Sequence, residues 1–287
     1  MAREKVVVKP KKKKMQVFDI VNYIIFVIIA LIIIVPIWKV LVDSFNAVGV
    51  YQFQLWPNRP TFDGYKTIIE TEKLYQPFLN SVYTTLAGAL LGLVLSTLGG
   101  YVLAQKELPG RDLIAGFLLF TMIFSGGMIP EYLVMKELGL VNNMWILVVK
   151  HGINVYNVVL MKNFFEGIPE SLYEAAKIDG CTPMGIFFRI VLPLSKAALA
   201  SIGLMFAVKF WNDYTNFKLY VVDNKLWNFQ IRLRSMIMEN DVPDESAVDP
   251  KTIQNAGTLV AILPFIVIYP FCQNYFVQGV NVGAVKE

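Results

Sequence analysis

Residues 168–193 read IPESLYEAAKIDGCTPMGIFFRIVLP, and this polar stretch lies between two long apolar segments. Pro169 suits the first position of a helix, where its missing N–H is not needed, and Glu170 suits the positive end of the helix dipole. Gly180 can end that helix in the left-handed conformation, which few other residues adopt readily. Thr182 then suits the cap of a second helix. The sequence therefore predicts two short helices joined by a tight turn.

The same stretch carries a spaced motif. It contains Glu174-Ala175-Ala176, then Asp179-Gly180, and later Ile190-x-Leu192-Pro193. This pattern resembles the EAA loop of ABC importer permeases. Its fuller form, E-A-A-x-x-D-G-x-x-x-x-x-x-F-x-x-I-x-L-P, resembles that of carbohydrate importers of the MalG type. The chain departs from the family at Cys181, where Ala is most common, and at Ala197, where a second proline is common. The alternative is an ordinary amphipathic surface helix.

The resemblance implies a mechanical role and a set of partners. A homologous second permease, two ATPase subunits and an extracytoplasmic sugar-binding protein would complete the importer. ATP and Mg²⁺ would bind to the ATPase chains, so this chain would bind no cofactor and would not be an enzyme. Small alanines would let the first helix seat in a cleft of one ATPase. The residues expected to couple the chain to the ATPase are Glu174, Ala175, Ala176, Asp179 and Gly180.

Composition agrees with a membrane protein. Of the 287 residues, 55% are hydrophobic, and the mean hydropathy is +0.52, which is too apolar for an ordinary soluble globule. The net charge of +4 is distributed unevenly, which argues against nucleic-acid binding. Cys181 and Cys272 lie far apart, and His151 is the single histidine, so the sequence offers no disulfide framework and no metal site. No G-x-x-x-x-G-K-[ST] phosphate loop is present.

The apolar runs predict an all-α membrane protein with six transmembrane helices, because each approaches the length needed to cross a bilayer. The six expected crossings lie at about residues 20–42, 78–104, 113–135, 144–164, 194–211 and 258–277. Together they form a permease domain over residues 20–277, with a coupling loop at 166–193 and an outer loop at 212–257. The basic tail, residues 1–19, is expected in the cytoplasm by the positive-inside rule. Six crossings return the tail at 278–287 to the same side, in the cell membrane.

Local patterns add detail to this topology. Small residues recur every four positions in the second crossing and predict close helix packing, at Gly88, Gly92, Ser96, Gly100 and Ala104. Ser125-Gly126-Gly127 and Pro130 predict a break in the third crossing, either an unwound pore-facing region or an ordinary kink. A short interfacial helix is expected at about 64–71. Alternation at Phe229, Ile231 and Leu233 predicts a short strand in the outer loop.

Polar residues within the apolar runs are candidates for a sugar pathway, because such residues usually face a bundle interior or water. The fourth crossing carries Lys150 and His151 besides two asparagines, and the fifth ends in Trp211-Asn212-Asp213-Tyr214, close to a pattern of MalG-like permeases. The alternatives are hydrogen bonds between helices and, for the aromatic residues, anchoring at the interface. Lys209 and Asp213 could form a pair four residues apart. The pathway candidates are Asn154, Asn157, Asn212, Asp213 and Tyr214.

The sequence thus predicts a permease subunit of a binding-protein-dependent carbohydrate importer. The segment Ser125–Pro130 resembles the branch that handles complex oligosaccharides. Two alternatives remain: an ABC permease for a non-sugar solute such as a polyamine or phosphate, and an intramembrane enzyme that uses Lys150, His151 and Asp213. An enzyme should act when purified alone, whereas a permease subunit should need its partners.

Overall fold

The computed structural model describes residues 17–49, 52–242 and 248–284, with side chains described as far as Gln273. Within these ranges the chain is almost entirely helical, and the β-structure there is one isolated bridge between Asn46 and Pro60. The all-α class is therefore confirmed. The predicted basic tail lies almost wholly outside the described residues, as do the last residues of the predicted C-terminal tail.

Three helices are long and apolar enough to cross a membrane, and these are α1 (Val17–Ser44), α3 (Glu72–Ala104) and α14 (Pro250–Ala284). Two bent pairs raise the number to five if each pair is one span. The first pair is α4 (Arg111–Ile123) with α5 (Met128–Glu137), bent by 113°, and the second is Pro183–Leu194 with α11 (Lys196–Trp211), bent by 80°. The predicted break at Ser125–Gly127 is confirmed, while the count of six crossings stays a prediction.

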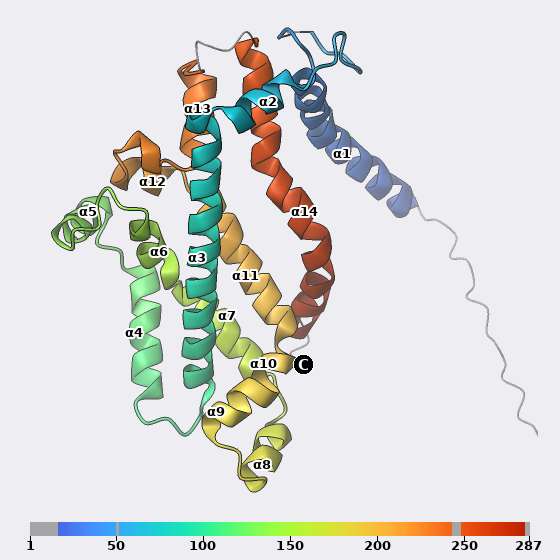
Figure 1. The fold of residues 1–287 in the computed structure, drawn as a ribbon. Helices are drawn as coiled ribbons and strands as arrows, with labels where there is room; N and C mark the ends of the chain where they lie inside the picture. The colour runs from blue at the N-terminus through green and yellow to red at the C-terminus, as the bar shows by residue number, and fades with distance from the viewer. Residues whose placement is uncertain (1–16, 50–51, 243–247, 285–287) are drawn as a thin grey trace, which may run out of the picture.

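Shorter elements connect these helices. They are α2 (Asp63–Glu70), α6 (Trp145–Gly152), α7 (Val155–Glu166), α8 (Glu170–Ile178), α9 (Pro183–Ile186), the π-helix η1 (Phe187–Val191), α10 (Leu192–Leu194), α12 (Thr215–Tyr220), the 3₁₀ turn η2 (Asn224–Leu226) and α13 (Phe229–Met238). In Figure 1, α8 and α9 lie at one end of the long helices, and α2 and α13 lie at the other. The helix expected at about 64–71 is confirmed as α2, while its position at the membrane interface stays a prediction.

Helix α3 is the centre of the bundle, because α6, α7, α11 and α13 all pack on it. A Cβ added at Gly92 would lie 2.5 Å from the ring of Phe206 on α11, and one at Gly88 would overlap the ring of Phe210. At Gly100 a Cβ would lie 2.9 Å from the backbone of α7. The small residues therefore admit two neighbouring helices, as the sequence predicts.

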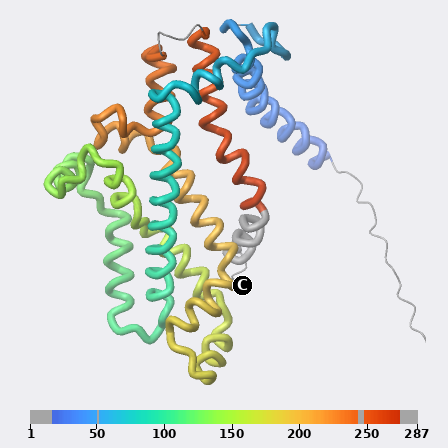
Figure 2. Tube along the Cα trace, in the orientation of Figure 1, coloured from blue at the N-terminus to red at the C-terminus, as the bar shows by residue number. Residues whose placement is uncertain are grey.

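Helix α1 packs in a different way. Its side chains are largely exposed until the last turn, where Val42, Asp43 and Ser44 are buried. That turn meets α14, and the buried Thr252 hydroxyl donates to the Asn46 carbonyl at 2.7 Å. In Figures 1 and 2 the rest of α1 slants away from the bundle.

The predicted strand at Phe229, Ile231 and Leu233 is wrong, since these residues form the first turns of α13. Asn228 caps that helix by accepting a hydrogen bond from the N–H of Ile231 at 3.0 Å. Arg232, which lies between these apolar residues in the sequence, is only 5% exposed. The alternation of apolar and polar residues wrongly indicates a strand here. The ion pair of Arg232 with Asp241 allows this polar residue to be buried beside its apolar neighbours.

Two predicted crossings also have different bounds. The run at 144–164 is two helices, α6 and α7, because the chain unwinds at Ile153 and Asn154 and the Asn154 side chain caps α7. The run at 258–277 begins earlier, at Pro250, and continues to Ala284 as α14. The outer loop at 212–257 therefore contains α12, η2, α13 and the start of α14 rather than irregular chain.

Candidate functional site

The coupling loop (residues 166–193) forms the two short helices that the sequence predicts. Gly180 has φ +76°, and its left-handed turn lets the N–H of Cys181 donate to the carbonyl of Ala176 at 2.9 Å. Thr182 caps α9 by accepting from the N–H of Gly185 at 3.2 Å. Pro169 precedes the first helical residue, so its predicted position is wrong by one residue.

The expected coupling residues divide between two faces of α8. Glu174, Ala175 and Asp179 are exposed, whereas Ala176 is only 4% exposed and belongs to the apolar core under the loop. Packing within this chain therefore favours a small residue at position 176, and the coupling role of Ala176 stays a prediction. Ile178 is 85% exposed and shares the open face with Glu174 and Ala175 at helical spacing. Sequence reasoning missed it, although an apolar residue just before Asp179-Gly180 was a usable signal.

The coupling loop is tied to the end of α3 and to the loop between α3 and α4. Lys106 pairs with Glu170 at 3.0 Å, and the Tyr101 hydroxyl donates to the Pro183 carbonyl at 2.9 Å. Tyr173 of α8 packs against the apolar core under the loop, where burial, and to a smaller extent the nearby Tyr101, raises the pKa of its phenol above the ordinary value. These contacts fix the orientation of α8 relative to the bundle.

A second group, here called the polar cluster, consists of Glu131, Lys150, His151, Asp213 and Asn216. Lys150 Nζ lies 2.9 Å from a Glu131 oxygen and donates to Asn216 Oδ1 at 2.9 Å. His151 Nε2 lies 2.9 Å from Asp213 Oδ2, and Asn216 Nδ2 donates to both oxygens of Asp213 at 3.0 Å. The side chains of His151 and Asp213 are 11% and 8% exposed. The cluster therefore joins α5, α6 and the segment after α11.

The expected pairing of Asp213 with Lys209 is wrong, because Asp213 pairs with His151 instead. Lys209 is exposed on α11, and no ion pair within 4 Å joins it to another described residue. Lys209 and Asp213 do not pair, although they are four residues apart in the sequence. His151 on α6 lies closer to the Asp213 carboxylate than Lys209 on α11 does.

The other pathway candidates have individual roles. Asn154 Oδ1 accepts from the N–H of Asn157, and Asn157 is buried with no hydrogen-bond partner for its own Oδ1 among the residues that the structure describes. Asn212 is exposed, and its amide donates to the Val208 carbonyl at 3.0 Å. The ring of Tyr214 lies under the guanidinium of Arg234, 4.5 Å from the ring centroid to Cζ. Because His151 pairs with Asp213, the candidates that follow α6 and the candidates that follow α11 lie in one region of the bundle.

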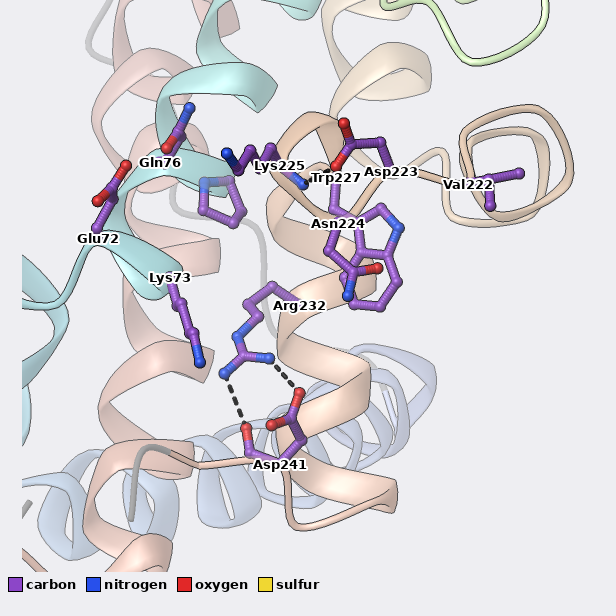
Figure 3. Close-up of a pocket in the computed structure, with 11 residues that line it drawn as sticks. Glu72, Lys73, Gln76, Val222, Asp223, Asn224, Lys225, Trp227, Arg232 and Asp241 are labelled. Carbon is purple, nitrogen blue, oxygen red and sulfur yellow. Dashed lines mark hydrogen bonds and ion pairs between the residues drawn. The ribbon is translucent and has the colours of Figure 1, made fainter. Parts of the chain in front are cut away.

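A third feature, here called the α3–α13 pocket, was missed by sequence reasoning. It is a cavity of about 720 Å³ between the start of α3 and the segment that carries η2 and α13. Figure 3 shows Glu72, Lys73 and Gln76 on one side and Trp227 on the other, with Arg232 below. The pocket and the coupling loop lie at opposite ends of α3 (Figure 1).

An ion pair forms one wall of this pocket. Arg232 bonds the carboxylate of Asp241 and donates a second hydrogen bond to the Asp241 carbonyl at 3.0 Å. Partial burial alone would raise the pKa of Asp241. The guanidinium of Arg232, hydrogen bonds from Ser235 and Arg232, and the charge of Lys73 outweigh it and hold that pKa below its ordinary value. The carboxylate therefore stays charged across the neutral range.

These features define a class of protein. Apolar membrane-crossing helices carry a polar cluster inside the bundle, and a separate helical loop projects at one end, which is the architecture of a membrane permease. The sequence of residues 113–282 matches the family described as "Binding-protein-dependent transport system inner membrane component". The chain belongs to this family, and it is a transporter subunit rather than an enzyme.

Individual relatives agree with this family assignment. The chain is 40% identical to the "Polygalacturonan/rhamnogalacturonan transport system permease protein YtcP" of Bacillus subtilis (strain 168), over 95% of this chain and 99% of that protein. It is 29% identical to the "Arabinooligosaccharides transport system permease protein AraQ" of Halalkalibacterium halodurans, over 96% and 99%. A chain of a solved bacterial ABC transporter "involved in the import of the acidic polysaccharide alginate" has 30% identity and a TM-score of 0.85, over 91% of this chain and 96% of that one.

Proposed function

We propose that this chain is one transmembrane permease of an ATP-driven, binding-protein-dependent importer of oligosaccharides. The observation that carries the proposal is near full-length similarity to permeases named for polygalacturonan, rhamnogalacturonan and arabinooligosaccharide transport. A second permease, two ATPase subunits that hold ATP and Mg²⁺, and an extracytoplasmic binding protein complete the importer. ATP closes the ATPase dimer, the coupling loop passes that movement to the helices, and the permeases alternate between inward-open and outward-open states.

The experiment is uptake by the reconstituted complex. Proteoliposomes with both permeases, the ATPases and the binding protein are given ATP and labelled trigalacturonate, arabinotriose or galactotriose. ATP-dependent accumulation of at least one of these sugars is expected. Uptake of spermidine or phosphate with no uptake of any oligosaccharide would replace the proposal with the non-sugar alternative.

Coupling to the ATPase runs through the open face of α8 in this proposal. Glu174, Ala175 and the exposed Ile178 make the contact, while Asp179 and Gly180 shape the turn that presents it. Glu174→Lys should lower sugar-stimulated ATP hydrolysis and co-purification of the ATPase together, because it reverses a charge at the contact. Lys196→Glu reverses an exposed charge at the start of α11 and is the matched control. Equal coupling in both variants would contradict this role.

The orientation proposed here places both termini and the coupling loop in the cytoplasm. It is supported by the basic residues before α1 and by the positive-inside rule. The test replaces Cys181 and Cys272 with serine and then introduces single cysteines at Asn240 and Glu174, which are both exposed. An impermeant maleimide added from outside should label position 240 and not position 174. The reverse pattern, or equal labelling, would refute the orientation.

The substrate pathway is proposed to pass the polar cluster at the exposed Asn212 and the half-buried Tyr214. Polar side chains at membrane depth support it, since they are costly unless they face protein or water. Asn212→Ala should lower uptake while basal ATP hydrolysis persists. Asn154→Ala should instead lower thermal stability, because Asn154 and its bonded neighbour Asn157 hold the start of α7. Asp213 serves as the acceptor that fixes His151, so Asp213 acts through position rather than through sugar contact.

A further inference from the structure

We propose that the α3–α13 pocket is a second sugar-binding site, separate from the polar cluster, which holds part of an oligosaccharide before it enters the bundle. This inference rests on the proposed function, because its ligand belongs to the proposed class of transported solute. The pocket lies at the end of α3 opposite the coupling loop, where a solute delivered by an extracytoplasmic protein would arrive (Figure 1).

The size and lining of the pocket match a sugar. Its volume of about 720 Å³ falls within the range of roughly 300–1,000 Å³ that is common for small-ligand sites. Trp227 supplies an indole, and an aromatic face can pack against the C–H face of a pyranose ring. Glu72, Lys73 and Gln76 line the cavity on the side opposite Trp227 (Figure 3). The pocket therefore combines an aromatic surface with hydrogen-bonding groups on the opposite wall.

The polar groups offer both donors and acceptors. Lys73 and Lys225 can donate, Glu72 can accept, and Gln76 can do both, which suits hydroxyl groups that themselves donate and accept. Among the described residues, Glu72, Lys73 and Lys225 form no ion pair within 4 Å. Within the described part of the chain their charged ends therefore have no ion-pair partner within 4 Å.

The charge balance of the lining argues against a site for simple anions. Its cations are Lys73, Lys225 and Arg232, and its anions are Glu72, Asp223 and Asp241. A phosphate or nucleotide site would carry an excess of positive charge, whereas a balanced set of donors and acceptors suits the hydroxyls of an oligosaccharide. The lining also includes few apolar side chains, which argues against a lipid tail.

The indole side of the pocket is held in place by the bundle. Asn80 on α3 donates to the carbonyls of Lys225 and Trp227, both at 2.9 Å. Lys218 Nζ lies 4.9 Å from the centroid of the Trp227 ring. Arg232 is fixed by Asp241, as described above. A site whose walls are already ordered loses little conformational entropy when a ligand binds.

The test measures sugar binding by the assembled complex of both permeases and the ATPases, without its binding protein. Galactotriose, arabinotriose and trigalacturonate are titrated by isothermal calorimetry. Glu72→Gln and Lys73→Gln should each weaken binding roughly tenfold, because each removes a hydrogen bond to a charged group. The matched controls are Glu70→Gln and Lys66→Gln, which change the exposed pair on the neighbouring α2 and should bind as the wild type does.

A second variant tests the aromatic wall of the pocket and changes no charged residue. Trp227→Phe keeps a ring but reduces its area, so it should weaken sugar binding several-fold and abolish any change in tryptophan fluorescence on titration. Trp56→Phe, at an exposed tryptophan in another part of the chain, is its control. Unaltered binding in Trp227→Phe, Glu72→Gln and Lys73→Gln would overturn the proposal.

The remaining outcomes separate this inference from the proposed function. Sugar uptake by the complete importer with no sugar binding by the complex alone would refute the pocket site and leave the importer intact. Normal sugar binding in the variants, with lost stimulation by the binding protein, would show that the pocket receives that protein and would also refute the inference. Pocket-dependent sugar binding without import would support the site and refute the proposed transport function.

Discussion

Gly180→Val tests the coupling loop most sharply, because it adds strain without adding a clash. Gly180 has φ +76°, and a Cβ built there meets no atom within 4 Å. Any effect must therefore come from the backbone conformation and not from crowding. A β-branched residue in this region costs about 1–3 kcal/mol, which corresponds to a factor of about 5 to 150 in an equilibrium constant.

That cost has unequal consequences for the bundle and for the loop. The turn can relieve the strain by leaving the left-handed conformation, and α8 then loses its fixed direction while the membrane helices keep their packing. We expect Gly180→Val to insert and assemble with the second permease. Its sugar-stimulated ATP hydrolysis and its uptake should fall together by at least fivefold, and the ATPase should co-purify less well.

The chain provides a control with the same strain. Gly110 also has φ +76° with no atom within 4 Å of a built Cβ, but it lies at the start of α4. Gly110→Val should therefore retain more coupling than Gly180→Val. Gly180→Asn should remain close to the wild type, because asparagine tolerates this conformation. Wild-type coupling in Gly180→Val, or equal losses in the two valine variants, would refute the reasoning.

Three further outcomes are expected. Gly92→Leu should lower the yield and the unfolding midpoint of the complex, because overpacking against the buried Phe206 ring on α11 costs about 1–3 kcal/mol or more. Gly116→Leu is the control and should not lower them, because a Cβ at Gly116 meets open space. Equal unfolding midpoints in the two variants would contradict this. Asp213→Asn should destabilise the bundle by about 1–3 kcal/mol, because one of the two oxygens that face His151 and Asn216 becomes an NH2 donor. An unchanged denaturation curve would contradict this. Asp241, whose pKa is lowered by folding, stabilises the fold above about pH 4; that stability should fall as the pH drops through its folded pKa, and Asp241→Asn should flatten the dependence.

Local chemistry made much of the fold predictable. The turn at Gly180 depends on one glycine followed by Thr182, and both signals lie within a few residues of the turn that they form. The packing of α3 was also predictable, because small residues four positions apart, such as Gly88 and Gly92, place one bare stripe along a helix. Nothing distant in the chain is needed for either inference.

The errors come from partners that are distant or unforeseen. The strand predicted at Phe229 failed because Asp241 allows Arg232 to be buried, which breaks the apparent alternation of exposed and buried residues. The partner of Asp213 was misassigned because His151 lies 62 positions away in the sequence. The α3–α13 pocket joins Glu72 to residues near 225–241 and carries no local pattern at all.

The packing of α1 has a consequence for biogenesis. Among the described helices α1 is synthesised first, yet the helix that its buried last turn meets, α14, is synthesised last. Thr252 closes the same junction by bonding Asn46 across 206 positions. Until α14 has been synthesised, α1 must therefore remain without this contact. A chain truncated before α14 should leave α1 without its helix partner, and we expect membrane quality-control proteases to degrade such a chain.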